Sequence, residues 1–567
     1  MTDDRIPFWK VAVGGMCAGL SGGILMLTTA ALLRTFLGSP SATELIFDRS
    51  FPLVSVNFFI EQINRFGGYV PLKIAGVKAS LSGQILAAVF VGLTYAVIIE
   101  AAQRRRNDNQ RRWIDPLGWK LGLAGLLVVW MGLLIFLWPT LGTQYYGVPS
   151  AIAPYLTSLG LLIEFGVCAA SILFFYGYLT HRRQFTPESR GTLLAGRKSR
   201  RAFIHLGITA LGAVAFGSLL RRLVRTSTID YDGNTYEGPD VEFITPNEDF
   251  YSVTKNLVDP DVARNIWSLE IAGAVDKPRT YSFAELTSLP ATEQLTTLCC
   301  ISNPVGGGLI SNARWKGVPL PSVLDAAKPK PGLEALLFHA ADGYYETFPI
   351  AKAFEPSTLL AYEMNGEPIP HIHGFPLRLI VPGLYGEKNP KWLTKIELLT
   401  ANDPRLKKTH GCGFYKEQGW GPNFVVPTTS RIDAPEVTNG KFTEEFKLGQ
   451  SSELRGIAFG GDRGVQKVEL SFDGAKSWSE ASIVEPGTQI SWSTWSYQWQ
   501  PETLGEYIIA VRATDGTGAP QISEDRGTVP QGATGLHRVQ AVVRGRDTAS
   551  DPVHRSGYDL SAVNGAS

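Results

Sequence analysis

Cysteine is scarce in this chain of 567 residues, which has only five: Cys17, Cys168, Cys299, Cys300 and Cys412. The first two lie in long apolar runs, so the sequence lacks the paired-cysteine framework that holds many small secreted domains together. It also contains no Cys-x-x-Cys-His motif, which would attach a c-type haem. Neither a disulfide framework nor a cytochrome domain of that type is therefore expected.

An excess of charge of one sign is also missing. The 53 basic and 52 acidic residues leave a net charge of +1, which gives no reason to expect a nucleic-acid partner. Histidine is rare in the first 222 residues, where only His181 and His205 occur, both at the edges of apolar runs. Because haems in helical bundles take axial ligands such as His or Met from facing helices, a b-type haem inside this region is not expected.

Long apolar runs, by contrast, dominate the first 222 residues. A bilayer crossing needs about 20 mostly apolar residues, and five blocks are long enough, so residues 1–222 are predicted to form a five-helix transmembrane domain. The fourth block contains Glu164, a carboxylate that is costly in a membrane and is either functional or paired inside the bundle. The blocks span residues 11–33, 80–101, 117–138, 155–179 and 203–220.

The basic residues between these blocks predict an orientation. Arginines are concentrated after the second block, in QRRRNDNQRRW, and after the fourth, in HRRQFTPESRGTLLAGRKSRR, whereas WPTLGTQYYGVPSA after the third has no charge. Cytoplasmic loops are enriched in Lys and Arg. The pattern therefore places the N-terminus inside and everything after the fifth block outside the cytoplasm, in a multi-pass protein of the cell membrane.

The rest of the chain has the composition of globular domains. Residues 223–240 form a polar linker, and residues 546–567 are a tail rich in Asp, Ser and Gly that is predicted to be disordered. Residues 401–545 contain many short alternating segments, such as the one with Val468, Leu470 and Phe472 on one face before an Asp473-Gly474 turn. Short strands separated by Gly/Asp turns predict a β-sandwich.

The most informative stretch lies in residues 295–320, LTTLCCISNPVGGGLISNARWKGVPL. It places Cys299 and Cys300 beside a Gly-rich turn. A cysteine on a short loop can be a metal ligand, a nucleophile or a packed small hydrophobe, and the residue types alone leave these three open.

Two long motifs resemble the sulfite oxidase family of molybdenum enzymes. One is L-x-C-x-S-N followed by G-G and N-A-R-W-x-G-V-P-L in the cysteine stretch; the other is residues 359–398, LLAYEMNGEPIPHIHGFPLRLIVPGLYGEKNPKWLTKIEL. The resemblance covers about residues 240–545. It implies an α+β molybdopterin domain over residues 241–400, a C-terminal domain of the immunoglobulin-like type that often makes the dimer contact, and molybdopterin as the cofactor. Aligning Cys-Ile-Ser-Asn puts Cys300, rather than Cys299, on the metal.

The resemblance also implies roles for other residues. Cys300 and Tyr344 would be catalytic, with Tyr344 or its neighbour Tyr345 near the metal, and a further set would hold the pterin and its phosphate. This cofactor-binding set comprises Asn247, Phe250, Tyr251, Asp342, His373, Arg378, Asn389, Pro390 and Lys391. The segment from Ser199 through Arg200 and Arg201 resembles a twin-arginine export signal, which would suit a domain that receives its cofactor before crossing the membrane.

These features together predict an exported, membrane-anchored oxidoreductase that transfers an oxygen atom to or from a small substrate and exchanges electrons with a separate quinone or cytochrome. Sulfite is not the expected substrate, because residues 301–305 after the ligand cysteine carry no charge and only Lys255 lies close behind Phe250 and Tyr251. The direction of the reaction is left open. An alternative is a non-catalytic interaction protein with a degenerate molybdenum fold, against which Cys300 and the His373–Arg378–Lys391 set argue.

Overall fold

The computed structural model describes residues 7–50, 54, 56–106, 116–142, 152–180, 228, 231–233, 242–403, 424–528 and 531–545. The chain divides into a helical unit (residues 1–54, 73–230 and 256–259) and a β-rich unit (residues 55–72, 231–255 and 260–567). The fifth apolar block, the Arg200-Arg201 pair, His181, His205, Cys412 and the tail after residue 545 lie outside the described residues.

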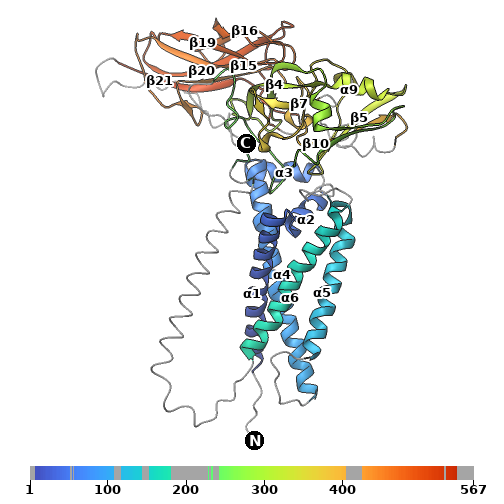
Figure 1. The fold of residues 1–567 in the computed structure, drawn as a ribbon. Helices are drawn as coiled ribbons and strands as arrows, with labels where there is room; N and C mark the ends of the chain where they lie inside the picture. The colour runs from blue at the N-terminus through green and yellow to red at the C-terminus, as the bar shows by residue number, and fades with distance from the viewer. Residues whose placement is uncertain are drawn as a thin grey trace, which may run out of the picture. The chain divides into compact units, whose positions relative to one another are not determined.

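The helical unit contains four helices that are long and apolar enough to cross a membrane, in agreement with the first four predicted blocks. Small residues let these helices approach closely. A methyl group on Gly19 of α1 would lie 2.4 Å from the carbonyl oxygen of Ala88 on α4. The helices of this unit, which Figure 1 shows in blue to cyan, are α1 (Phe8–Leu37), α2 (Ala42–Ser50), α4 (Tyr69–Arg106, in this unit from residue 73), α5 (Pro116–Leu137), η2 (Trp138–Thr140) and α6 (Ala153–Thr180).

The β-rich unit begins with a central domain built on two sheets. One sheet has the strand order β2-β1-β10-β5-β6, and the other has the order β3-β4-β7-β8 with β9 added on β7. Its short helix α8 starts at a capping box, in which Ser282 and Glu285 each bond the other's backbone N–H. The strands are β1 (Ser268–Gly273), β2 (Arg279–Ser282), β3 (Thr292–Cys299), β4 (Ile310–Pro319), β5 (Leu333–Ala340), β6 (Tyr345–Glu346), β7 (Leu359–Met364), β8 (Glu367–Pro368), β9 (Arg378–Ile380) and β10 (Leu393–Thr400).

Short helices complete this unit. They are α3 (Val56–Phe66), α8 (Phe283–Thr287), α9 (Leu320–Ala327), α10 (Ile350–Ala353), η5 (His371–His373) and η6 (Gly386–Lys388). The apolar residues of β1, β4, β5, β10 and α9 share one core, which fixes the central domain as the scaffold for the loops that follow β3 and precede β10.

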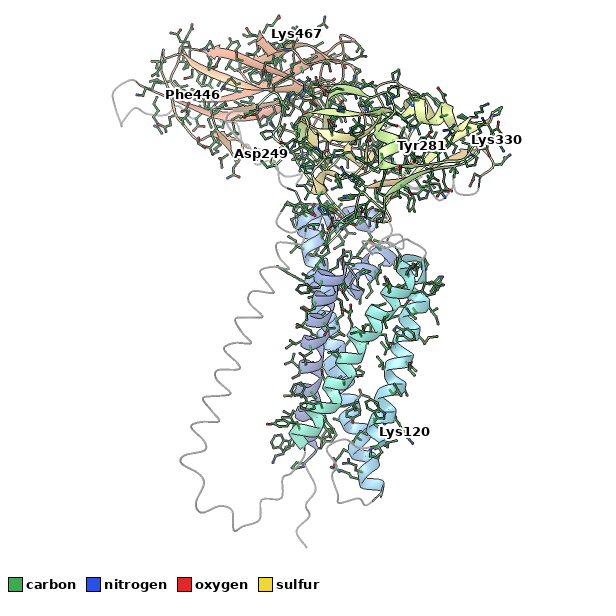
Figure 2. All side chains as sticks on the ribbon, in the orientation of Figure 1. Lys120, Asp249, Tyr281, Lys330, Phe446 and Lys467 are labelled. Carbon is green, nitrogen blue, oxygen red and sulfur yellow. The ribbon has the colours of Figure 1, made fainter. Side chains whose placement is uncertain are left out.

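The C-terminal domain consists of a four-stranded sheet, β11-β15-β19-β18, and a larger sheet containing β12, β13, β14, β21, β20, β16 and β17. Val468 and Leu470 are fully buried and Phe472 packs against the same core, so these three residues share one face as predicted, although Glu469 and Ser471 between them are also buried. Phe446, labelled in Figure 2, packs edge-on against Phe442 and Trp499. The strands are β11 (Thr429–Ala434), β12 (Val437–Thr438), β13 (Lys441–Phe442), β14 (Phe446–Lys447), β15 (Ser452–Phe459), β16 (Val465–Ser471), β17 (Ser479–Glu480), β18 (Ser482–Glu485), β19 (Ser493–Trp499), β20 (Gly505–Asp515) and β21 (His537–Arg544).

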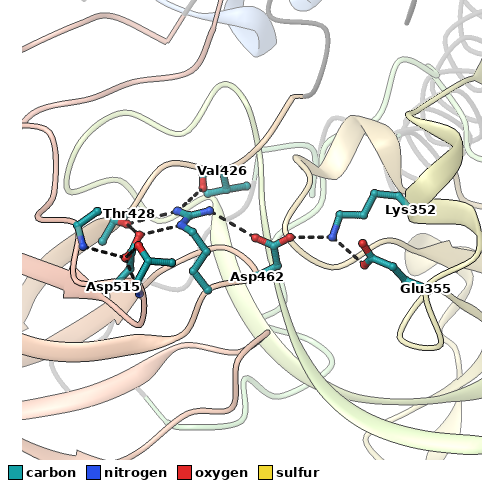
Figure 3. Close-up of polar contacts among 9 residues, drawn as sticks. Lys352, Glu355, Val426, Thr428, Asp462 and Asp515 are labelled. Atoms are coloured by element: carbon teal, nitrogen blue, oxygen red, sulfur yellow. Dashed lines mark hydrogen bonds and ion pairs between the residues drawn. The ribbon is translucent and has the colours of Figure 1, made fainter.

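The central and C-terminal domains share an apolar and a polar contact. Cys299 and Ile301 belong to one buried cluster with Phe459 and Trp492 of the C-terminal domain. Beside it, Lys352 Nζ pairs with Asp462 Oδ2 at 2.7 Å and with Glu355 Oε2 at 2.8 Å, as Figure 3 shows. The Cys299–Cys300 loop is therefore supported from both domains.

Candidate cofactor site

The loop that carries the two cysteines is closed by its own hydrogen bonds. It connects β3 to β4, and the backbone N–H of Cys300 donates to the carbonyl of Leu309 at 2.9 Å. The Asn303 side chain accepts from the Leu309 N–H at 2.8 Å, while the Asn303 N–H donates to the Cys300 carbonyl at 3.0 Å. These bonds across the Gly-rich turn hold the cysteine backbone in one position.

The two cysteines enter different surroundings, because successive side chains of an extended segment point in opposite directions. Cys299 joins the apolar cluster shared with the C-terminal domain, whereas Cys300 joins a cluster with Phe250, Tyr251 and Trp315. Burial raises the pKa of both thiols, and that of Cys300 reaches about 11, with Glu387 and Asp232 adding to the effect and hydrogen bonds at Ser302 opposing it. A thiolate at Cys300 therefore requires a positive partner, as a metal ligand would have.

Aromatic rings surround Cys300. Phe250 stacks on Tyr251 with ring centroids 5.5 Å apart, and its edge contacts Trp315 at 5.6 Å and His373 at 5.4 Å. These rings come from the segment before β1, from β4 and from η5. The fold thus brings three of the predicted cofactor-binding residues, Phe250, Tyr251 and His373, to one place beside Cys300.

Arg378 lies in the same region and is only 5% exposed. Its guanidinium lies 5.0 Å from the centre of the Trp315 ring and donates to the carbonyls of His373 at 3.0 Å and Asn389 at 3.4 Å. Burial lowers its pKa to about 10, and its Nε has no hydrogen-bond partner among the described residues. A buried guanidinium with a spare donor suits an anionic ligand such as a phosphate.

Other predicted residues form the walls of this region through contacts with the backbone. His373 Nε2 lies 2.8 Å from the carbonyl oxygen of Asn247, and Lys391 Nζ donates to the Ile372 carbonyl at 3.0 Å. The Asn389 side chain accepts from the Val381 N–H at 2.6 Å and donates to the Tyr385 carbonyl at 2.9 Å. Pro390 accepts from the Leu379 N–H at 3.0 Å. Asn389 and Pro390 therefore shape the loop, and their contact with the cofactor stays a prediction.

Asp342 and Tyr344 lie in the turn between β5 and β6. Asp342 Oδ1 accepts from the Tyr344 N–H at 2.9 Å, an arrangement typical of aspartate in turns. The Tyr344 hydroxyl donates to Glu346 Oε2 at 3.1 Å and to the Glu387 carbonyl at 2.8 Å. These bonds link the turn to η6, and the catalytic role of Tyr344 stays a prediction.

Sequence reasoning missed a group of charged residues next to these. Lys388 and Glu346 form a buried ion pair at 2.8 Å, with side chains 1% and 3% exposed. The neighbouring Glu387 has a carboxylate oxygen with no hydrogen-bond partner among the described residues, and burial raises its pKa to about 7. The Tyr-Gly-Glu-Lys run before Asn389 holds two of these residues, but its sequence gives no sign that Glu346 meets them.

An open cleft lies between the two domains of the β-rich unit. It is bordered by Cys299, Asn303 and Tyr385 of the central domain and by residues 426–429 and 533–535 of the C-terminal domain. It reaches Cys299 rather than Cys300. The aromatic rings, Arg378 and Glu387 lie on the Cys300 side, and the binding of the cofactor there stays a prediction.

Comparison with known proteins identifies the family of this chain. Residues 256–406 match the oxidoreductase molybdopterin binding domain, and residues 426–526 match the Mo-co oxidoreductase dimerisation domain. The sulfite oxidase of Gallus gallus is 31% identical over 317 residues, covering 48% of this chain and 67% of that enzyme. The chain belongs to the sulfite oxidase family. Its members bind molybdopterin, and the unpartnered atoms of Arg378 and Glu387 around a buried thiol fit that cofactor.

Two further similar proteins show how much of each chain is matched. The mitochondrial sulfite oxidase of Drosophila melanogaster is 30% identical over 292 residues, which cover 45% of this chain and 50% of that protein. The chain thus matches about half of the length of that relative. The sulfane dehydrogenase SoxCD of Paracoccus pantotrophus is similar with a TM-score of 0.47 and 22% identity, over 55% of this chain and 86% of that one.

Proposed function

We propose that this molybdopterin oxidoreductase is anchored in the cell membrane, works outside the cytoplasm, and transfers an oxygen atom to or from a small substrate other than sulfite. A separate carrier, a quinone or a cytochrome, exchanges electrons with it. The observation that carries the substrate proposal is the charge around Cys300. Burial and the nearby carboxylates of Glu387 and Asp232 raise the pKa of its thiol, and Ile301 to Val305, which follow it, carry no charge.

Each residue near Cys300 has a task in this proposal. The Cys300 thiolate holds the metal, and Arg378 and Lys391 hold the phosphate end of the pterin, with His373 and Asn247 beside it. When bound, the cofactor supplies two-electron oxygen-atom transfer. Phe250, Tyr251 and Trp315 exclude water from the thiol, and the Glu387 carboxyl group, with a pKa of about 7, would be able to hold or give up a proton beside the thiol at neutral pH.

Sulfite is a poor match for such a pocket. Sulfite is a dianion, and each charge-assisted hydrogen bond that holds one is worth roughly 1.5–3 kcal/mol. Ile301 to Val305 carry no charge, and Lys255 Nζ already donates to the Asp342 carbonyl at 2.9 Å. A neutral or weakly charged sulfoxide, N-oxide or other small polar molecule suits these surroundings better.

The substrate proposal is tested by steady-state assays of the purified full-length protein with an artificial electron acceptor or donor. The expected result is turnover with a neutral S-oxide or N-oxide, or with its reduced partner, and weak turnover with sulfite. Efficient turnover at micromolar sulfite would overturn the substrate proposal and leave the family assignment intact.

The membrane proposal is supported by the four apolar helices and by the distribution of arginines between them. A reporter fused after residue 230 should be active only outside the cytoplasm, and one fused near residue 190 only inside. The double substitution Arg200→Lys and Arg201→Lys should block export. Normal export of this variant would indicate that the domain does not cross the membrane already folded.

The C-terminal domain is proposed to adopt an immunoglobulin-like sandwich and to join two copies of the chain. Its two sheets share one apolar core, and its match is to a dimerisation domain. Light scattering of the detergent-solubilised protein should give the mass of two chains, and a single-chain mass would refute the proposed dimer.

A further inference from the structure

A cluster of buried polar groups lies in the helical unit, where α1, α2 and α6 meet. Glu164 of α6 is 1% exposed and accepts a hydrogen bond from the backbone N–H of Ala42 at the start of α2. Thr157 and Gly160 lie on the same face of α6, because they precede Glu164 by two turns and one turn. Ser39 lies against this face, since a methyl group on Gly160 would be 2.4 Å from its Oγ.

The charges of this cluster do not balance. Arg34 pairs with Glu44 at 2.8 Å, with side chains 6% and 2% exposed, and Glu44 also accepts from the Ser41 N–H and hydroxyl at 2.9 Å. Among the residues that the structure describes, no ion pair reaches Glu164. One guanidinium therefore faces two carboxylates.

Two other elements contribute neutral polar groups here. On α4, Gln84 donates to Thr43 of α2 at 2.7 Å, and on α5 the Trp130 indole donates to the Ser158 carbonyl at 2.9 Å. Three buried oxygens of the cluster have no hydrogen-bond partner in the described part of the chain: Glu164 Oε1, Thr157 Oγ1 and Ser39 Oγ. Each of these residues is at most 3% exposed.

We propose that this cluster binds one monovalent cation, a proton or an alkali-metal ion, at the carboxyl group of Glu164. A buried charge without a partner is strongly unfavourable, and one cation restores neutrality to a set that holds one positive and two negative groups. The hydroxyl oxygens of Thr157 and Ser39 supply the hard oxygen ligands that an alkali ion needs. The helical unit thus has a ligand of its own, which goes beyond anchoring the oxidoreductase.

The test uses the full-length protein in detergent, with the melting of its helices followed by circular dichroism at constant ionic strength. A ligand that binds only the folded state raises the melting temperature. Melting should therefore rise as the pH falls if the ligand is a proton, and rise as sodium or potassium chloride replaces choline chloride if it is an alkali ion. A proton that stays bound at every pH tested should appear as the infrared band of a protonated carboxyl group.

Three variants separate these outcomes. Glu164→Gln keeps the shape without the charge and should abolish the pH dependence, the salt dependence and the infrared band. Thr157→Val should weaken only the response to an alkali ion. Glu100→Gln is the control, because buried Glu100 already pairs with Arg104 at 3.1 Å, and this variant should behave as the parent does. If the parent protein shows neither dependence nor the band, or if Glu164→Gln keeps them, the proposal is wrong.

Discussion

Two polar clusters of the β-rich unit, each around a buried side chain, differ in how completely their atoms are bonded. In the C-terminal domain, Asp515 Oδ2 accepts from Arg463 Nε at 2.7 Å and from Thr428 at 3.0 Å, while Oδ1 accepts from Thr517 and Ala519 (Figure 3). Next to Cys300, by contrast, Arg378 Nε and a carboxylate oxygen of Glu387 have no partner among the described residues. In the first cluster both carboxylate oxygens of Asp515 already accept hydrogen bonds, so the cluster serves the structure alone. In the second, beside the buried Cys300 thiol, polar atoms remain that a ligand could bond.

From this comparison we expect the Lys388–Glu346 ion pair to stabilise the fold rather than to bind the cofactor, although it lies close to Glu387. Lys388→Met leaves Glu346 charged and buried without its partner, which costs about 3–5 kcal/mol in the free energy of unfolding. The double variant with Glu346→Gln should recover most of this loss. Denaturant titration measures both, and equal losses in the single and double variants would contradict the ion-pair account.

Removing a member of the Asp515 cluster should also destabilise the fold, by a smaller amount. Asp515→Ala removes the acceptor of the partly buried Arg463 and Thr428 and should cost about 1–2 kcal/mol while leaving the cofactor content unchanged. Metal analysis and unfolding curves measure the two effects. Loss of molybdenum from a folded Asp515→Ala protein would contradict the purely structural role of the Asp515 cluster.

This cluster also predicts a pH dependence. Burial by itself raises the pKa of Asp515, but hydrogen bonds from Thr517, Arg463 and Thr428 outweigh it and hold the pKa at about 2, below the ordinary value of 3.8. A lowered pKa contributes stability that is present above the unfolded value and is lost as the pH falls through the folded value. The free energy of unfolding of the C-terminal domain should therefore decrease as the pH is lowered from about 4 to 2. The decrease should be smaller in Asp515→Asn.

Glu387→Gln tests the comparison at the cluster that has unpartnered atoms. Because its raised pKa of about 7 reflects burial, the ionised form is unfavourable, and stability is lost as the pH rises from the ordinary 4.5 through 7. The amide should remove that loss in protein prepared without cofactor, so the free energy of unfolding of this variant should depend less on pH between 4.5 and 7 than that of the parent. The same variant should impair cofactor retention or turnover. A variant that changes neither would place Glu387 outside the site.

Local patterns predicted much of this molecule. The shared face of Val468, Leu470 and Phe472 follows from neighbouring residues, and the four apolar helices follow from length and composition. The Phe250–Tyr251 pair, His373 and Arg378 could be assigned to one site only through the family resemblance, because their chain positions are far apart. Nothing local predicts that Glu346 meets Lys388, or that Lys352 reaches Asp462 across 110 positions, since such pairs depend on tertiary packing.

The assignment of the metal to Cys300 rather than Cys299 is the central claim, and X-ray absorption at the molybdenum edge tests it most directly. In full-length protein carrying its cofactor, Cys300→Ser should remove one sulfur from the metal's coordination shell and abolish turnover, while the pterin and the fold are retained. Cys299→Ser, the matched control from the apolar cluster at the domain contact, should keep the parent's sulfur count and most of its activity. Loss of the sulfur in Cys299→Ser together with its retention in Cys300→Ser would contradict the account and shift the ligand by one residue.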